Sequence, residues 1–183
     1  MSESALVFGN ACVHDASVVK GKARISENAV IKGHVIIERN ASIRGRAFLK
    51  GNGMIVTEDA HIDGYAKILG NAYVGGNTVI TDHATILGNA TIEGSTYIGG
   101  EAILHKARRI EHPEGILIIG PIGKRKSHIT INIPDKRFAT CYANGTISEL
   151  EEIANKEGDV EIQRIVPYIK GLVADRNRKI KSR

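Results

Sequence analysis

The sequence predicts a mainly β protein, a parallel β-helix of about five coils with a small α+β cap at its C-terminal end. Two observations lead to this prediction. A small residue recurs every six positions through residues 11–104, and an aliphatic residue follows each one two places later. A fixed short period is typical of a solenoid, and six residues are too few for a helix and its connection. Each unit is therefore expected to be a short strand and a turn.

The repeat forms two series of eight units, with one extra residue between them that this register places near residues 57–59. The small positions are Ala11, Ser17, Ala23, Ala29, Val35, Ala41, Ala47 and Gly53, then Ala60, Ala66, Ala72, Thr78, Ala84, Ala90, Thr96 and Ala102. The aliphatic positions are Val13, Val19, Ile25, Ile31, Ile37, Ile43, Leu49 and Ile55, then Ile62, Ile68, Val74, Ile80, Ile86, Ile92, Ile98 and Leu104. Gly and Asn recur between the units, and both tolerate the left-handed backbone of a sharp corner.

Alternation along each strand turns the small and the aliphatic residue inward and the residue between them outward. Sixteen buried aliphatic side chains, at about 1.5–3 kcal/mol each, make a sufficient core. This explains how the chain folds with no Trp and only three Phe.

The six-residue spacing ends after Leu104, so the repeat domain is placed at residues 1–106. Residues 107–175 are expected to form the small α+β domain, and residues 176–183 a basic, mobile tail. Within the small domain, strands are predicted at 115–119, 128–133 and 137–142, with a turn at Asn144 and Gly145.

Two helices are predicted to follow these strands. Thr146 and Glu149 have the spacing of a capping box, which opens a helix that runs to about residue 155. Asp159 is placed to cap a second helix that runs to about residue 174, and Pro167 is expected to interrupt it.

Composition limits the compartment and the partners. The sequence has no apolar run long enough to cross a membrane and no start that resembles a signal peptide, so we expect a cytoplasmic protein of a bacterium or a phage-infected host, with no membrane partner. The two cysteines, Cys12 and Cys141, lack metal-ligand spacing. The formal net charge of +5 belongs to residues 124–183, which hold 13 Lys and Arg against eight Asp and Glu.

The repeat resembles that of the bacterial transferase hexapeptide-repeat superfamily, over about residues 6–106. That resemblance implies a left-handed β-helix of triangular cross-section with three units per coil. Here Gly falls two places after the aliphatic residue, as in V-x-G-N-A, which is similar to a subset of these proteins. Periodicity alone leaves the handedness open, because parallel crossovers are normally right-handed.

With three units per coil, equivalent outward positions recur every 18 residues, or every 19 across the extra residue. The three columns are Cys12, Val30, Phe48, Lys67, Thr85 and Ile103; Val18, Ile36, Met54, Tyr73 and Thr91; and Arg24, Ser42, His61, Val79 and Tyr97. The second column is apolar over four successive coils, and Val30 and Phe48 of the first column lie on neighbouring strands. An exposed apolar ribbon of this length is unfavourable in water. Because hexapeptide-repeat proteins usually form trimers, the resemblance implies a homotrimer interface at Val18, Val30, Ile36, Phe48, Met54 and Tyr73. The alternative is that the C-terminal segment folds back over the ribbon.

The segment that joins the two parts, residues 119–125 (IGPIGKR), resembles a junction shared by short hexapeptide-repeat proteins of phages and prophages. Its basic residues follow a Gly-rich turn, so backbone N–H groups and cations could converge on a phosphate. The candidate ligand-binding residues are Arg108, Arg109, Gly123, Lys124, Arg125, Lys126 and His128. The alternative is a solvated charged loop. No aromatic residues interleave with the cations, so nucleic acid is not favoured as a partner.

Enzymes of the family transfer an acyl group from acyl-CoA with a His as general base, and His61 or His83 would be the candidates here. Those enzymes usually carry a loop that encloses the acceptor, whereas one extra residue is the only interruption of this repeat. A zinc site like that of the γ-carbonic anhydrases is also disfavoured, because His61, His83 and His105 are 22 residues apart, which is no multiple of a coil. We therefore assign no catalytic residue, metal or cofactor.

The sequence favours a non-enzymatic homotrimer of phage or prophage type that binds an anionic, nucleotide-like small ligand or a protein partner. Sequestration of a host immune nucleotide signal is one form that this function could take. An acyl-CoA-dependent acyltransferase is the first alternative, and a structural or virion component is the second.

Overall fold

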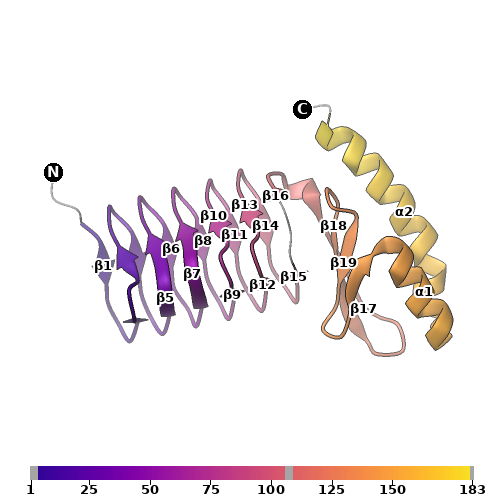
Figure 1. The fold of residues 1–183 in the computed structure, drawn as a ribbon, viewed down its shortest axis with the longest axis horizontal. Coiled ribbons are helices and arrows are strands. Elements are labelled where there is room, and N and C mark those ends of the chain that lie inside the picture. The colour runs from indigo at the N-terminus through magenta and orange to yellow at the C-terminus, as the bar shows by residue number, and fades with distance from the viewer. Residues whose placement is uncertain (1–3, 106–108, 182–183) are drawn as a thin grey trace.

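The computed structural model describes residues 4–105 and 109–181. It shows an elongated parallel β-solenoid followed by a four-stranded antiparallel sheet and two helices (Figure 1). The predicted fold class is confirmed, and the solenoid has about six coils where about five were expected.

Three flat faces make up the solenoid, and they are numbered here in chain order. Face 1 contains β1 (Leu6–Val7), β4 (Arg24–Ile25), β6 (Ser42–Ile43), β8 (His61–Ile62), β11 (Val79–Ile80) and β14 (Tyr97–Ile98). Face 2 contains β2 (Cys12–Val13), β9 (Lys67–Leu69), β12 (Thr85–Leu87) and β15 (Ile103–His105), and face 3 contains β3 (Val18–Val19), β10 (Tyr73–Val74), β13 (Thr91–Ile92) and β16 (Arg109–Ile110). The long strands β5 (Val30–Ile37) and β7 (Phe48–Val56) pass round the corner between faces 2 and 3 and belong to both.

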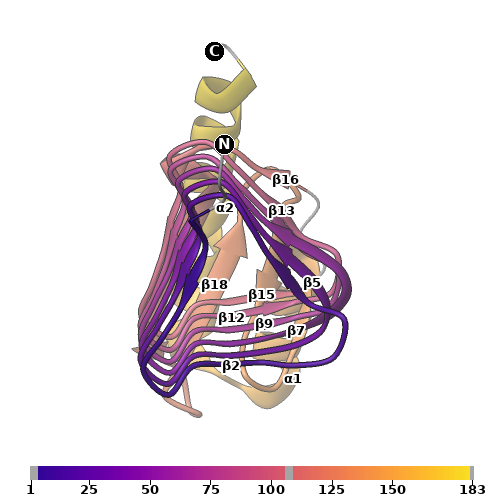
Figure 2. The same ribbon diagram turned by 90° about the vertical axis from the view of Figure 1, so that its left-hand side faces the viewer.

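The solenoid is left-handed. Figure 2 looks along its axis from the N-terminal end. The chain passes from β12 at the base to β13 on the right and returns to the base at β15, farther from the viewer, which is a counterclockwise path that recedes. All strand pairs between coils are parallel, as in β4 with β6 and β12 with β15.

The interior holds stacked Ala and Ile side chains, as the alternation predicts. Ile25, Ile43, Ile62, Ile80 and Ile98 form one such stack on face 1, and each has 0 % exposure. Where Thr replaces Ala at the small position, its buried hydroxyl donates to a carbonyl of the preceding turn. Thr78 Oγ1 lies 2.6 Å from the Gly75 oxygen and Thr96 Oγ1 lies 2.8 Å from the Glu93 oxygen. These polar side chains are therefore compatible with the dry interior.

The extra residue lies earlier than the repeat predicted. Met54 pairs with Val35 of the preceding coil and is fully buried, while Ile55 pairs with Ile36 and faces outward. The strand therefore accommodates the extra residue near Asn52 and Gly53, where the register of β5 and β7 shifts, and not at residues 57–59. This corrects the predicted outward position of Met54 and its place in the oligomer interface.

The coil pairing also extends further than expected, because β16 pairs with β13 beyond residue 106. The small domain then begins with a 3₁₀ turn, η1 (Pro113–Gly115). Its sheet has the order β17 (Ile116–Ile122), β18 (Ser127–Asn132), β19 (Arg137–Ala139) and β20 (Asn144–Thr146). Asn144 and Gly145 thus lie in a strand instead of the predicted turn.

Helix α1 (Ile147–Glu157) begins with the predicted capping box, in which Thr146 accepts from the Glu149 N–H and Glu149 accepts from the Thr146 N–H. Helix α2 (Val160–Lys181) begins after Asp159 and contains Pro167 without ending there. The prediction that Pro167 interrupts this helix is wrong, because the side chains on both sides of it, Val166 and Ile169, are fully buried against the sheet.

The described part of the predicted mobile tail, residues 176–181, is the last part of α2. Arg176 donates to the Ile116 carbonyl at 3.3 Å, and Asn177 donates to the Ile133 carbonyl at 3.4 Å. These hydrogen bonds hold the last turns of α2 against the first residue of β17 and the residue that follows β18.

The small domain covers the C-terminal end of the solenoid and leaves its long faces uncovered (Figure 1). The Ile103 N–H of the last complete coil donates to Thr130 Oγ1 of β18 at 2.8 Å. The C-terminal segment does not fold back over the apolar ribbon, since Val18 and Ile36 stay 47 % and 36 % exposed in the single chain.

Candidate anion-binding site

The basic residues of the junction are each held by the protein's own oxygen atoms. They lie in the turn between β17 and β18, beside the end of α1 and the start of α2. Arg125 Nη2 is 3.0 Å from Glu157 Oε1, Lys126 Nζ is 3.1 Å from Glu161 Oε1, and Lys124 Nζ donates to the Glu157 carbonyl at 2.5 Å. The Glu157 carboxylate raises the pKa of Arg125, and the hydrogen bond from Lys126 is the main cause that lowers the pKa of Glu161.

The backbone N–H groups of the same turn are also occupied. The Gly123 N–H donates to Glu161 Oε2 at 2.8 Å, and the Lys124 N–H donates to Asp159 Oδ2 at 2.7 Å. Asp159 is only 2 % exposed, and its other oxygen caps α2 by accepting from the Ile162 N–H at 3.2 Å. The predicted convergence of donors therefore exists, but the anions that it holds are the carboxylates of Asp159 and Glu161.

The other candidates for the junction site lie apart from this turn or have other partners. Arg109 is on face 3 and forms ion pairs with Glu111 at 2.7 Å and with Glu93 at 3.5 Å. His128 lines a solvent-open recess of about 470 Å³ together with Lys126 and Cys141. Arg108 lies outside the described residues.

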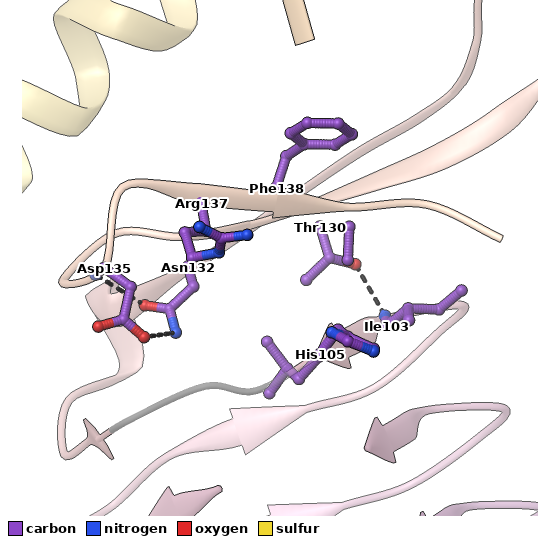
Figure 3. A pocket seen from close by; sticks show the side chains of 9 residues that line it. Ile103, His105, Thr130, Asn132, Asp135, Arg137 and Phe138 are labelled. Atoms are coloured by element: carbon purple, nitrogen blue, oxygen red, sulfur yellow. Dashed lines mark hydrogen bonds between the residues drawn. The ribbon is translucent and has the colours of Figure 1, made fainter. Parts of the chain in front are cut away.

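A second polar group of residues lies between the last coil and the small domain (Figure 3). Asn132 and Asp135 are joined by two hydrogen bonds of 2.9 and 3.2 Å, and His105 and Arg137 lie on opposite sides of the space. The cavity measures about 10 Å³, which is room for about one water molecule. It therefore serves the contact between the two domains and is too small for an organic ligand.

The two candidate general bases lie in different places. His61 is on face 1, with its Nε2 3.8 Å from Asp63 Oδ2. Burial acts to raise the pKa of Asp63, but hydrogen bonds from the Gly64 N–H and from Arg44, whose Nε lies 2.7 Å away, outweigh it and lower that pKa. The carboxylate that faces His61 is therefore already held by another cation.

His83 lies at the corner between faces 1 and 2. Its ring stacks on Tyr65 with the centroids 4.9 Å apart and the planes 8° apart. The Arg46 guanidinium lies 5.6 Å from the centroid of the same Tyr65 ring. His83 thus belongs to a row of stacked side chains from three successive coils, in which its ring packs against a neighbour.

Face 2 carries three exposed cations, two of which lie outside the outward columns predicted from the repeat. Lys32 and Lys50 are directly opposite each other in the register of β5 and β7, and Lys67 lies opposite Phe48 on the next coil. All three lysines are exposed, and none forms an ion pair within the part of the chain that the structure describes. We call Lys32, Lys50 and Lys67 the lysine ladder.

Further polar groups border the lysine ladder at the corner between faces 2 and 3. His34 Nδ1 is 3.4 Å from Asn52 Oδ1, and the Asn52 N–H donates to Asn71 Oδ1 at 2.9 Å. Phe48 is half-buried between the lysines, and Val30 lies next to it on the preceding coil. The lysine ladder therefore has an aromatic ring beside it on face 2 and hydrogen-bonding groups at the adjoining corner.

The remaining predicted interface residues form an apolar stripe along face 3. Val18, Ile36 and Tyr73 occupy it as expected, and Ile55 takes the place that was assigned to Met54. We call Val18, Ile36, Ile55 and Tyr73 the apolar stripe. It lies round the corner from the lysine ladder, because β5 and β7 contribute residues to both.

Over the described ranges, no three His, Cys, Asp or Glu side chains are grouped as metal ligands would be. The helices among the described residues are too short or too polar to span a bilayer. Comparison with protein-family models, with curated proteins and with solved structures found no match to this chain.

Proposed function

We propose that the protein is a non-enzymatic homotrimer that binds a nucleotide-like anion on the lysine ladder. The observation that supports this proposal is the direct opposition of Lys32 and Lys50, two exposed cations that share no carboxylate partner within the described chain. The site differs from the junction that the sequence favoured, where every described cation already contacts the protein's own oxygen atoms.

Like charges that lie directly opposite each other on neighbouring strands destabilise a sheet. Adjacent strands are about 4.8 Å apart, so the flexible side chains of Lys32 and Lys50 can reach the same phosphate group. An anion between them replaces repulsion with two charge-assisted hydrogen bonds. A feature that opposes local stability in this way is expected at a binding site.

Stacking on the Phe48 ring would make the site bind a nucleotide more tightly than a simple phosphate. Its ring is half-buried beside Lys67 and at the start of the strand that carries Lys50. A base stacked on an aromatic side chain gains about 1–3 kcal/mol. Because the backbone of the coils and the half-buried Phe48 ring are in place before the ligand arrives, the ordering needed on binding is that of the lysine side chains. Sequestration of a nucleotide signal is the biological form that we propose for such binding.

The trimer is proposed from the apolar stripe. Val18, Ile36, Ile55 and Tyr73 form a continuous outward row on face 3, and the small domain does not cover it. Threefold contact along this row would bury it and would repeat the lysine ladder at three equivalent places.

The binding proposal is tested by thermal unfolding in the presence of ATP, NAD⁺ or a cyclic dinucleotide. A ligand at 100 times its dissociation constant adds about 2.7 kcal/mol to the free energy of unfolding. We expect stabilisation of the wild type by at least one of these nucleotides, and its loss in the double variant Lys32→Glu/Lys50→Glu.

Lys126→Glu is the matched control, because Lys126 is an exposed lysine that already pairs with Glu161. This variant should bind as the wild type does. The proposal is wrong if no nucleotide stabilises the wild type, or if the double variant binds normally. It is also wrong if Lys126→Glu abolishes binding while the double variant retains it.

Acyl transfer is the second candidate. Its supporting observation is that His61 Nε2 lies 3.8 Å from Asp63 Oδ2, although Arg44 lies closer to the same oxygen, at 2.7 Å. A carboxylate beside an imidazole can orient it as a general base. An assay for free thiol with acetyl-CoA and an amine or alcohol acceptor separates the two functions. Thioester cleavage that His61→Ala abolishes and His83→Ala preserves would support the enzyme and contradict our main proposal.

A further inference from the structure

The first coil of the solenoid ends in three unpaired strand edges. Among residues 4–105 and 109–181, β1 pairs only with β4, and β2 and β3 each pair only with β5. The N–H groups of Leu6 and Phe8 donate to the second coil at 2.9 and 3.0 Å. Because successive N–H groups of a strand point in opposite directions, the Val7 N–H between them points toward the open end.

The same pattern recurs on face 2 of the first coil. Cys12 and His14 both donate to the second coil at 2.9 Å, so the Val13 N–H between them also points outward along the axis. Edge groups of this kind are ready to pair with strands of another chain.

The inward side chains of this coil are also uncovered. Val7 is 47 % exposed, whereas Ile25, which occupies the same place one coil later, is 0 % exposed. Val13 and Val19 are only partly buried, and Phe8 at the rim is 54 % exposed. Terminal repeats of solenoids normally present a polar outer face, and this one is apolar.

Electrostatics permit two such ends to meet. The first coil, residues 5–22, carries Asp15, Lys20 and Lys22, and Lys20 pairs with Glu38 of the second coil at 3.0 Å. Two copies can therefore approach end to end with little like-charge repulsion.

The opposite end of the solenoid is not available for this contact. The small domain covers it, and the Ile103 N–H of that end is bound by Thr130. Stacking of one copy's first coil on another copy's last coil is thus blocked. In the part of the chain that the structure describes, the first coil is the surface with three free strand edges arranged in a triangle, so the surface that matches it is the first coil of a second copy.

We propose that two copies dock through their first coils, head to head about a twofold axis. The twofold axis makes the paired edges of β1, β2 and β3 antiparallel, and the contact buries Val7, Val13 and Val19. The contact closes on itself and cannot grow into a fibre. It does not depend on the lysine ladder, and if the chain is also a trimer, two trimers join in this way.

The test is the mass of the assembly in solution, measured by light scattering. The wild type should have twice the mass of the variants Val7→Arg and Val7→Pro. The arginine places charge in the apolar contact, and the proline removes the outward N–H, which is tolerated at a strand edge. Tyr168→Arg, at a 68 % exposed site on α2, is the control and should keep the wild-type mass.

Hydrogen exchange provides a second measurement. The amides of Val7, Val13 and Val19 should be protected in the wild type and exchange faster in Val7→Arg. The inference is overturned if the folded variants and the wild type have equal mass, or if these three amides exchange freely in the wild type. Either result leaves nucleotide binding on face 2 to be judged by its own experiment.

Discussion

Lys50 lies directly opposite Lys32 on the neighbouring coil, and neither ammonium group has a carboxylate within ion-pair distance among the described residues. Elsewhere on the solenoid, cations of one coil do meet acids of the next, as Lys20 meets Glu38 at 3.0 Å and Arg44 meets Asp63 at 2.7 Å. The two lysines therefore lack the ion pairing between coils that Lys20 and Arg44 have at the corners of the solenoid.

The first prediction follows from this repulsion. Lys50→Glu should raise the free energy of unfolding of the ligand-free protein by about 0.2–1 kcal/mol, because an opposite-charge pair with Lys32 replaces a like-charge pair. Urea denaturation at low salt measures the change, and Lys50→Gln should give a smaller increase. A destabilised Lys50→Glu protein would contradict the repulsion.

The second prediction concerns the register of β7. Met54→Ala should cost about 2–5 kcal/mol, because Met54 is fully buried and its removal leaves a cavity. Ile55→Ala should cost clearly less, because Ile55 faces outward on the apolar stripe. Denaturant unfolding at a concentration that dissociates any oligomer compares the two. A larger loss of stability for Ile55→Ala than for Met54→Ala would mean that Ile55 is the buried residue, as the six-residue repeat alone predicted.

The third prediction separates two glycines at corners. At Gly33, φ is +93° and a Cβ would lie 2.1 Å from the Gly51 carbonyl oxygen, so Gly33→Ala must push two coils apart. At Gly100, φ is +61° and a Cβ would meet no atom within 4 Å. Gly100→Ala should cost only the left-handed backbone strain of about 1–2 kcal/mol. Thermal unfolding should show a much larger loss for Gly33→Ala, and equal losses would contradict the close approach of the coils.

The fourth prediction concerns Asp159. Asp159→Ala removes the cap of α2, which costs about 0.5–2 kcal/mol, and it leaves the Lys124 N–H without its partner, which costs about 1–3 kcal/mol more. Thr146→Ala removes only the side-chain cap of α1 and should cost about 0.5–2 kcal/mol. If chemical denaturation shows equal losses, Asp159 does not hold the junction turn.

The fifth prediction concerns acid stability. The pKa of Asp63 is lowered in the folded protein, so the unfolded chain binds more protons near pH 4 and stability rises with pH there. The contribution of Asp63 is present above its ordinary pKa of 3.8 and is lost as the pH falls through its lower, folded value. Asp63→Asn should therefore flatten the acid limb of a plot of unfolding free energy against pH. An unchanged limb would show that Asp63 is not held by Arg44 in solution.

Short-range patterns predicted much of the fold because their causes are local. Thr146 and Glu149 of the capping box are three positions apart, and the box formed as expected. The prediction from Pro167 failed because the destabilising effect of proline on the helix is opposed by the burial of Val166 and Ile169 against a sheet that is far away in the sequence.

The sequence alone did not show which basic residues have carboxylate partners in the fold. Lys124, Arg125 and Lys126 form a conspicuous basic run, but their partners lie 32 to 35 residues later in the chain. Lys32 and Lys50 look unremarkable in the sequence, and their spacing of 18 residues is the signal that could have found them. The predicted outward columns pass through the residue between the two inward positions, whereas Lys32 and Lys50 lie two places further along their strands.

The six-residue period by itself determined that the chain coils into a solenoid with Ala and Ile inside, because strand alternation acts over neighbouring residues. The tertiary structure decided where the extra residue lies, which carboxylates hold the basic junction, and that the lysine ladder has no partner in the described chain. At residues 54–56 three apolar side chains in succession satisfy either register, so only pairing with β5 could select Met54 as the buried one. Pairing of charges likewise depends on distance in space, which local sequence does not set.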